Sequence, residues 1–356
     1  MNASPSHQPH PAEWTETQSL LPSAERDLPA GRHQFHKEQM MARIHEDLRT
    51  PRTAPVAPPK RPNPFLRRAV LLPAAAFALA GAVVGGLALT GGGAQGGKTA
   101  LATGPALTTQ VGVADAKGAP QLLGRISLAA ADTSAPTPRK GQYVYIASKV
   151  ADTYVKDDGG AKVVSDELHT RQVWEDLDGK DGWLIEAGAT SDEGMTLASD
   201  VSKTGAYNAL VELPTDPDAL LRQIYRDSDA VRDPEVPRDQ AAFVAIGDLL
   251  TESFPPAEVS AALYKAAAKI PGVVAVNDAV DATGRHGIAI ARENDADGQR
   301  TEWIFDKKTL EFLGSRDVVV KKMADSPFEV GTVRHTSAIT ERAFVDAAKR
   351  VPGQAS

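Results

Sequence analysis

The pattern of apolar and polar positions predicts β-strands over much of the C-terminal part of the chain. Tyr143 and Tyr145 alternate with Val144 and Ile146, and this period of two is typical of a strand. The same pattern, interrupted by turns rich in Gly and Asp, predicts strands at 141–155, 167–176, 183–188, 273–284, 286–294, 300–309 and 311–323. The last apolar segment, 329–351, fits either one long strand or a strand followed by a helix.

Three amphipathic helices are predicted between these groups of strands, at 213–228, 239–254 and 255–273. Asp216 directly before Pro217 is a typical helix start. Consecutive strands with clustered helices predict an α+β fold, in which one curved antiparallel sheet, half-barrel-like, carries the helices on one face. We expect five aromatic residues on strands of this sheet: Tyr143, Tyr145, Trp183, Trp303 and Phe305.

An uncharged run from Ala69 to Thr90 predicts a single transmembrane helix. At about 1.5 Å per residue it spans roughly 33 Å, enough for a hydrocarbon core of about 30 Å. A secretory signal has its apolar core close to the N-terminus, whereas the whole segment 1–68 precedes this one. Arg67 and Arg68 leave twin-arginine export as the alternative. Within the run, Gly81 and Gly85 form a G-x-x-x-G pattern that allows two such helices to pack closely as a dimer.

The distribution of charge predicts the orientation of this helix. Residues 1–68 hold 10 Lys and Arg against 7 Asp and Glu, a net charge of +3; the remainder carries −10, which gives the total of −7. The positive-inside rule therefore places the N-terminus in the cytoplasm and the C-terminal domain outside the cell membrane. An acidic exterior domain also argues against binding to nucleic acid.

The segment before the membrane helix, residues 1–68, is rich in Pro, Ser and charged residues and is predicted to be mostly disordered. A short amphipathic helix at 35–49 is the exception. Met41, Ile44 and Leu48 share one face of this helix, which has no core of its own to cover it. These three residues are therefore candidates for docking on a cytoplasmic partner or on the membrane surface.

Behind the membrane helix at 69–90, residues 91–138 are rich in Gly, Ala and Thr and are predicted to be a linker. A strand or a short helix is expected within it, at 122–131. The folded α+β domain is predicted at 139–356, long enough to bury a sizeable core.

Sequence motifs of enzymes are missing from the chain. It contains no G-x-S-x-G, no H-E-x-x-H and no phosphate-binding loop, so we expect neither enzymatic activity nor a cofactor. The chain has no cysteine, which excludes disulfides, lipoprotein anchors, zinc–thiolate sites and iron–sulfur clusters.

Metal binding is not expected either. Two acidic clusters, Asp176 to Asp181 and Glu293 to Asp297, are interpreted as solvated hairpin turns. A calcium loop needs a glutamate six residues after its glycine, and the residue in that position after Gly298 is Ile304.

Several stretches resemble a known family. The segments ERDLPAGRHQFHKEQMM, GQYVYI, DATGRHGIAIAR and EWIFDKKTLEFLGSRDVVV are similar to an uncharacterised family of actinobacterial single-pass membrane proteins, typically encoded beside extracytoplasmic-function sigma factors. The late strand pairs are also similar to the half-barrels of lipoprotein carriers and sigma-regulator sensors. That similarity implies ligand binding against the concave face of the sheet, at residues it does not identify.

Two functions remain open on this basis. In the first, the exterior domain senses a signal and the cytoplasmic helix contacts a regulator such as a sigma factor. In the second, the exterior domain is an anchored carrier or binding module for a lipidic or peptide ligand. Whether the exterior domain contains a deep apolar cavity is the observation that would do most to decide between them.

Overall fold

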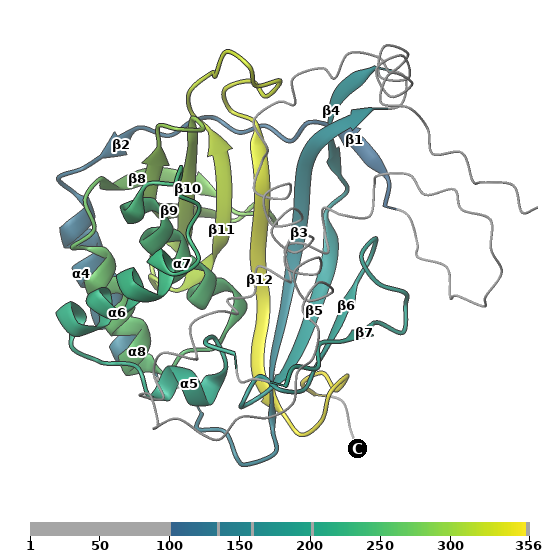
Figure 1. The fold of residues 1–356 in the computed structure, drawn as a ribbon, viewed down its shortest axis with the longest axis vertical. Coiled ribbons are helices and arrows are strands. Elements are labelled where there is room, and N and C mark those ends of the chain that lie inside the picture. Colours follow the sequence, from purple (N-terminus) through teal and green to yellow (C-terminus); the bar gives the residue numbers. More distant parts are fainter. Residues whose placement is uncertain (1–100, 134–135, 158–159, 201–202, 354–356) are drawn as a thin grey trace, which may run out of the picture. The chain divides into compact units, whose positions relative to one another are not determined.

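The computed structural model describes residues 101–133, 136–157, 160–200 and 203–353 (Figure 1). The predicted membrane helix at 69–90, the docking residues Met41, Ile44 and Leu48, and the pair Gly81 and Gly85 lie outside these residues. No helix within the described ranges has the length and apolar character needed to cross a membrane.

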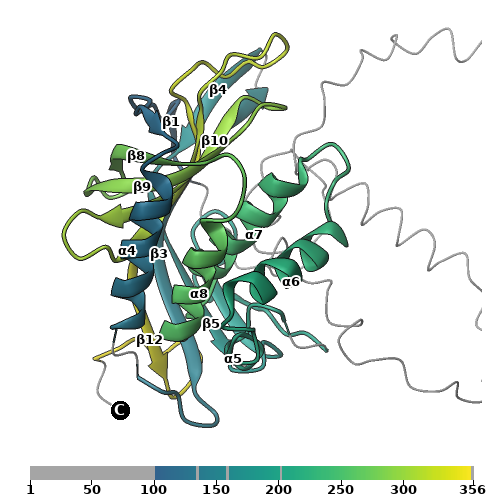
Figure 2. The same cartoon turned by 90° about the vertical axis from the view of Figure 1, so that its left-hand side faces the viewer.

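The described strands form one antiparallel sheet in the order β2-β8-β9-β10-β11-β12-β3-β5-β6-β7, and β4 pairs with β3 and β1. Their bounds are β1 Thr103–Pro105, β2 Ala114–Asp115, β3 Tyr143–Asp157, β4 Ala161–Asp166, β5 His169–Asp176, β6 Gly182–Glu186, β7 Met195–Thr196, β8 Val273–Val280, β9 His286–Asn294, β10 Gln299–Asp306, β11 Phe312–Val319 and β12 Val333–Val345. The sheet is curved and does not close (Figure 2). The final apolar segment contributes one strand, β12, which lies in the middle of the sheet between β11 and β3.

Five helices accompany the sheet in the described part of the chain: α4 Ala119–Ala131, α5 Tyr207–Val211, α6 Pro217–Asp229, α7 Arg238–Glu252 and α8 Ala257–Ala267. The predicted start of α6 is confirmed, because the Asp216 carboxylate accepts a hydrogen bond from the backbone N–H of Ala219 at 2.8 Å. Figure 2 shows α6, α7 and α8 on one side of the sheet, as predicted.

The main core lies between these helices and strands β8 to β11. Phe243 on α7 stacks on Trp303 of β10 with ring centroids 3.9 Å apart, and Tyr264 on α8 meets Phe305 edge-on. Gly247 allows this approach, since a Cβ atom there would lie 2.5 Å from Trp303 Nε1. The close packing brings α7 down onto the sheet and fixes its direction across the strands.

All five predicted aromatic residues lie on strands of the sheet, but they divide between its two faces. Trp303 and Phe305 face the helices. Tyr145 faces the opposite side, where it meets Trp174 at 5.1 Å and packs against the C-terminal segment around Val351. The alternation therefore predicts which neighbours share a face but does not show that the two aromatic pairs point in opposite directions.

Residues 101–133, part of the segment 91–138 that was predicted to be a linker, contribute to the fold. Helix α4 buries Ala119, Leu123 and Ile126 in the main core. Of the two alternatives left open for 122–131, a strand or a short helix, the structure has the helix. Strand β1 pairs with β4, and β2 pairs with β8. The sheet and its core thus begin before Arg139.

The segment 107–115, here called the strap, crosses the face of β8 to β11 that lies away from α6 to α8. Beneath it, the Glu302 carboxylate accepts hydrogen bonds from two guanidinium groups, from Arg300 Nε and from Arg316 Nε, each at 2.8 Å. These three side chains are at most 4 % exposed. The guanidinium groups also donate to the strap, to the Gly112 carbonyl at 3.0 Å and to Thr109 Oγ1 at 3.1 Å. Both faces of this half of the sheet are therefore covered.

Candidate binding cleft

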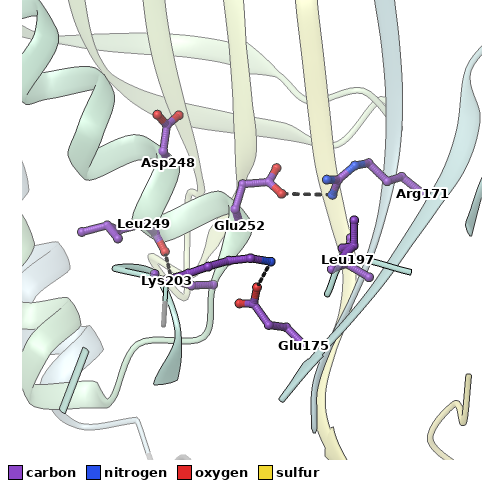
Figure 3. A pocket seen from close by; sticks show the side chains of 10 residues that line it. Arg171, Glu175, Leu197, Lys203, Asp248, Leu249 and Glu252 are labelled. Carbon is purple, nitrogen blue, oxygen red and sulfur yellow. Dashed lines mark hydrogen bonds and ion pairs between the residues drawn. The ribbon is translucent and has the colours of Figure 1, made fainter. Parts of the chain in front are cut away.

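A small cleft lies between the C-terminal end of α7 and strand β5, with a cavity volume of about 40 Å³ (Figure 3). Its polar lining residues are Arg171, Glu175, Lys203, Asp248, Glu252 and Ser253. Its other lining residues are Val173, Leu197, Gly205 and Leu249. A smaller hollow adjoins it and adds Val144, Ile146 and Phe254 to the apolar wall. We call the two together the α7–β5 cleft.

The fold explains how these residues meet. Arg171, Val173 and Glu175 alternate along β5, so their side chains share the face that looks toward α7. Val144 and Ile146 pair with β5 from the neighbouring strand β3. Helix α7 runs from β9 and β10 toward β5, and its last turn delivers acidic groups to the cleft, while the loop before α5 delivers Lys203.

Arg171 joins the sheet to the helix. Its Nη1 lies 3.0 Å from a carboxylate oxygen of Glu252, the last residue of α7, and its Nε lies 3.2 Å from Glu186 on β6. Burial acts to lower the pKa of Arg171, but the two carboxylates outweigh it and raise the pKa. A cation at the C-terminus of α7 is also favoured by the helix dipole.

Behind Arg171, the ion pairs continue into the sheet. His169 Nε2 lies 3.3 Å from Glu186, and the two side chains are 7 % and 3 % exposed. Burial lowers the pKa of His169, but its contacts with Glu186 and the Glu167 carbonyl raise it overall. Arg171 and His169 thus hold Glu186 in place, and neither cation is left available for an anionic ligand.

Lys203 and Glu175 form a second ion pair inside the cleft. Figure 3 shows the two side chains pointing toward one another, and Lys203 Nζ lies 2.5 Å from a Glu175 oxygen. The side chains are 19 % and 17 % exposed, so the pair is largely withdrawn from water. Burial raises the pKa of Glu175, Lys203 acts to lower it, and the neighbouring charges of Asp176 and Glu252 raise it further.

Two further cations lie on β12 at the same face of the sheet. His335 Nδ1 contacts Asp152 at 2.8 Å; burial lowers its pKa, but Asp152 and Asp317 outweigh burial and raise the pKa to about 9. The half-buried Arg342 donates to the Leu250 carbonyl near the end of α7, and burial lowers its pKa to about 10. The hydrogen bond of Arg342 holds the end of α7 against the sheet beside the cleft.

The acidic clusters singled out in the sequence lie elsewhere. Asp176 Oδ1 accepts hydrogen bonds from the backbone N–H groups of Lys180 and Asp181, which closes the turn between β5 and β6. Asp297 caps the β9–β10 turn through the backbone N–H of Gln299. Among the described residues, no group of three or more His, Asp or Glu side chains is arranged to hold a metal ion.

Sequence reasoning did not identify the cleft residues. The alternation in 167–176 places Arg171 and Glu175 on one face with Val173, and charged residues on a partly apolar face were the available signal. Lys203 and Glu252 come from distant segments, and only the folded chain brings them to β5. The predicted docking residues and the G-x-x-x-G pair lie outside the described ranges.

The comparisons with known proteins give no family assignment: no protein-family model matches the chain, and no curated protein matches it.

Proposed function

We propose that this protein is a single-pass membrane protein whose C-terminal domain binds a polar ligand, a peptide segment, outside the cytoplasm. The α7–β5 cleft is the observation that carries this proposal. It combines apolar walls with ion pairs that are largely removed from water, and such pairs form selective contacts only with a ligand of matching charge.

The charged lining favours a peptide over an acyl chain. Filling the cleft with hydrocarbon would strip the remaining water from Glu175, Lys203 and Glu252 without offering them a hydrogen bond. A peptide provides amides, carbonyls and charged side chains for these groups, while Val173 and Leu249 remain available to its apolar side chains. In this proposal the curved, half-barrel-like sheet holds the peptide against its concave face.

The remaining parts of the chain give the proposal its cellular setting. The run 69–90 anchors the protein with its N-terminus in the cytoplasm, and the acidic domain faces outward. Met41, Ile44 and Leu48 form the docking face for a cytoplasmic regulator such as a sigma factor. The support for that regulator is the resemblance of the sequence to membrane proteins encoded beside sigma factors.

A variant that fills the cleft tests the binding function. A Cβ atom at Gly205 would have Leu249 Cδ2 as its nearest neighbour at 3.9 Å, so the backbone accepts a side chain at this lining position, and the ring of Gly205→Phe would compete with a ligand for the cleft. Gly124→Phe is the matched control, because a Cβ there meets nothing within 4 Å and the position is exposed on α4. The full chain in lipid nanodiscs is used to select binders from a library of phage-displayed random heptapeptides.

The expected result is a set of peptides that bind the wild type and the Gly124→Phe variant with equal affinity and lose at least about tenfold on the Gly205→Phe variant. Selection of no binder, or binders that are insensitive to Gly205→Phe, would contradict the proposed site.

The topology and the cytoplasmic contact have separate tests. In a chain without native cysteine, Leu128→Cys on the exposed side of α4 should react with a membrane-impermeant thiol reagent on intact cells, and Ser23→Cys should not. Ile44→Asp should weaken capture of a co-expressed sigma factor and leave the unfolding of the exterior domain unchanged. Equal labelling at both cysteines refutes the orientation, and unchanged capture refutes the docking face.

A further inference from the structure

The position of Lys203 inside the α7–β5 cleft is the feature that identifies the chemistry of the ligand. Lys203 belongs to the loop that precedes α5, not to the sheet or to α7, and its ammonium group reaches into the cleft to contact Glu175 at 2.5 Å. Figure 3 shows its side chain extended, with the ammonium group directed at Glu175. The chain therefore already places one ammonium group on a long apolar stem in this cleft.

The ion pairs of the cleft make Glu175 the acid that an added cation would meet. Glu252 is already engaged by Arg171, which also contacts Glu186 behind it. Glu175 pairs with Lys203, and among the described residues no second cation forms an ion pair with it.

The apolar residues of the cleft suit the stem of such a group. Val173 neighbours Glu175 on the same face of β5, and Leu197 and Leu249 line the opposite walls. Side chains that carry an ammonium group bury their methylene groups along apolar surface and keep the charge at a polar end. Glu175 is the polar end of this cleft.

We propose that the ligand carries a primary ammonium group, which displaces Lys203 from Glu175 and takes its place. This inference rests on the proposed binding function of the cleft and specifies the chemistry of its ligand. A lysine side chain and the free N-terminus of a peptide both supply the group. Lys203 acts as an internal competitor: it pairs with the Glu175 carboxylate until a ligand displaces it, one whose ammonium group is attached to an apolar chain that packs better in the cleft.

Removal of the competitor gives the first test. Lys203→Met keeps the length of the side chain and removes its charge, so Glu175 becomes available to an external ammonium group. Lys269→Met is the matched control, because Lys269 pairs with Asp218 at 2.8 Å on the surface, at a site that does not line the cleft. Glu175→Gln in the Lys203→Met background removes the carboxylate itself.

Three tripeptides serve as probes of the full chain in nanodiscs, with calorimetric titration to millimolar concentration. Acetyl-Ala-Lys-Ala-amide carries the ammonium on a side chain, Ala-Ala-Ala-amide carries it at the N-terminus, and acetyl-Ala-norleucine-Ala-amide carries none. We expect Lys203→Met to bind at least one ammonium probe about tenfold more tightly than wild type does, as the release of a buried ion-pair partner allows. Lys269→Met should bind each probe with the affinity of wild type. Adding Glu175→Gln to Lys203→Met should abolish the gain in affinity, and the norleucine probe should show no gain for any variant.

Proton release gives an independent readout. Lys203 lowers the pKa of Glu175 while burial, Asp176 on β5 and Glu252 on α7 raise it, so loss of Lys203 leaves a carboxyl that holds its proton to higher pH. An ammonium probe must expel that proton to bind. The affinity of the lysine probe for Lys203→Met should therefore increase as the pH rises and the carboxyl loses its proton, and the heat of binding should depend on the ionisation enthalpy of the buffer.

The outcomes separate this inference from the function on which it rests. Equal binding of the lysine and norleucine probes, or no gain from Lys203→Met, overturns the ammonium proposal; the binding function then stands if selected heptapeptides remain sensitive to Gly205→Phe. Loss of that sensitivity as well overturns both. A gain for the lysine probe alone assigns the site to a side chain, and a gain for Ala-Ala-Ala-amide alone assigns it to an N-terminus; either supports the proposal.

Discussion

The two halves of the sheet use the same antiparallel ladder for different purposes. Strands β8 to β11 pack Trp303 and Phe305 against α7 and α8, and the strap covers their other face. Strands β12, β3, β5 and β6 meet the end of α7 and, through Phe344 and Tyr207, helix α5. Beside these contacts Arg171 and Glu175 line a cleft. The first half stabilises the domain, and the second half is available for binding.

The two halves of the sheet also differ in how far their ion pairs are buried. Glu302 lies between Arg300 and Arg316 with no exposed surface, and its ion pairs are sealed beneath the strap. Lys203 and Glu175 remain 19 % and 17 % exposed at the cleft. A sealed pair is costly to break because a lone charge stays buried, whereas a pair beside water can be exchanged for another partner.

Trp303→Ala should have the largest effect on stability. It removes a fully buried side chain that stacks on Phe243 and leaves a cavity between α7 and β10, at a cost of about 3–5 kcal/mol in the free energy of unfolding. Urea unfolding of the full chain in nanodiscs measures it. Trp183→Ala, which changes a half-buried ring beside Lys349 in the other half, should cost clearly less. Equal losses would remove the distinction between the halves.

Glu302→Gln should come next, at about 3 kcal/mol, because the amide still accepts one hydrogen bond but leaves the buried Arg316 without its counter-charge and Arg300 with only the more distant Glu293. The same denaturation measurement applies. Glu293→Gln serves as the control, since this carboxylate is 46 % exposed and lies 3.5 Å from the same Arg300. The control should change stability by less than about 1 kcal/mol.

His335 predicts a pH dependence of intermediate size. Its folded-state pKa of about 9 lies above the ordinary value of 6.5, so its stabilising contribution is complete below pH 6.5 and is lost as the pH rises toward 9. Between pH 6 and 8 the loss should be about 2 kcal/mol. The groups that face it are Asp152, Asp317 and Glu252. His335→Gln should flatten this part of the stability profile; an unchanged slope would assign it to other groups.

Lys203→Met should have the smallest effect on stability. The pair is largely withdrawn from water, but Glu175 can take up a proton when its partner is lost, so the cost should stay below that of Glu302→Gln. A loss as large as that of Glu302→Gln would mean that Lys203 is structural and cannot yield its place to a ligand.

The sequence predicted the strands of the sheet better than it predicted which segments pack over the two faces of the sheet. Alternation located the strands around Tyr145 and Trp303, and the Asp216–Pro217 pair located the start of α6, because these signals are local. Helix α4 was predicted only as a strand or a short helix within a linker, since its Ala-rich sequence resembles the composition of the linker around it.

The covering of charged positions was not predictable in the same way. Arg300 and Glu302 alternate with Thr301 and Trp303, a pattern typical of a solvated face, yet the strap closes over them from a distant part of the chain, as the hydrogen bond from Arg300 to Gly112 shows. Arg171 and Glu175 also depend on distant partners, Glu252 and Lys203. Local periodicity carries no information about such contacts.

Cysteine accessibility tests the central claim most directly, because the chain has no native cysteine. Val173→Cys places a thiol in the cleft, and Ile290→Cys places one at a position with no exposed surface in the packed half. With a small cationic methanethiosulfonate reagent, Val173→Cys should react in the folded protein and should slow at least about tenfold when Gly205→Phe is added, whereas Ile290→Cys should react only in denaturant. Equal protection of the two thiols, or equal reactivity, would contradict a sheet with one sealed half and one open half.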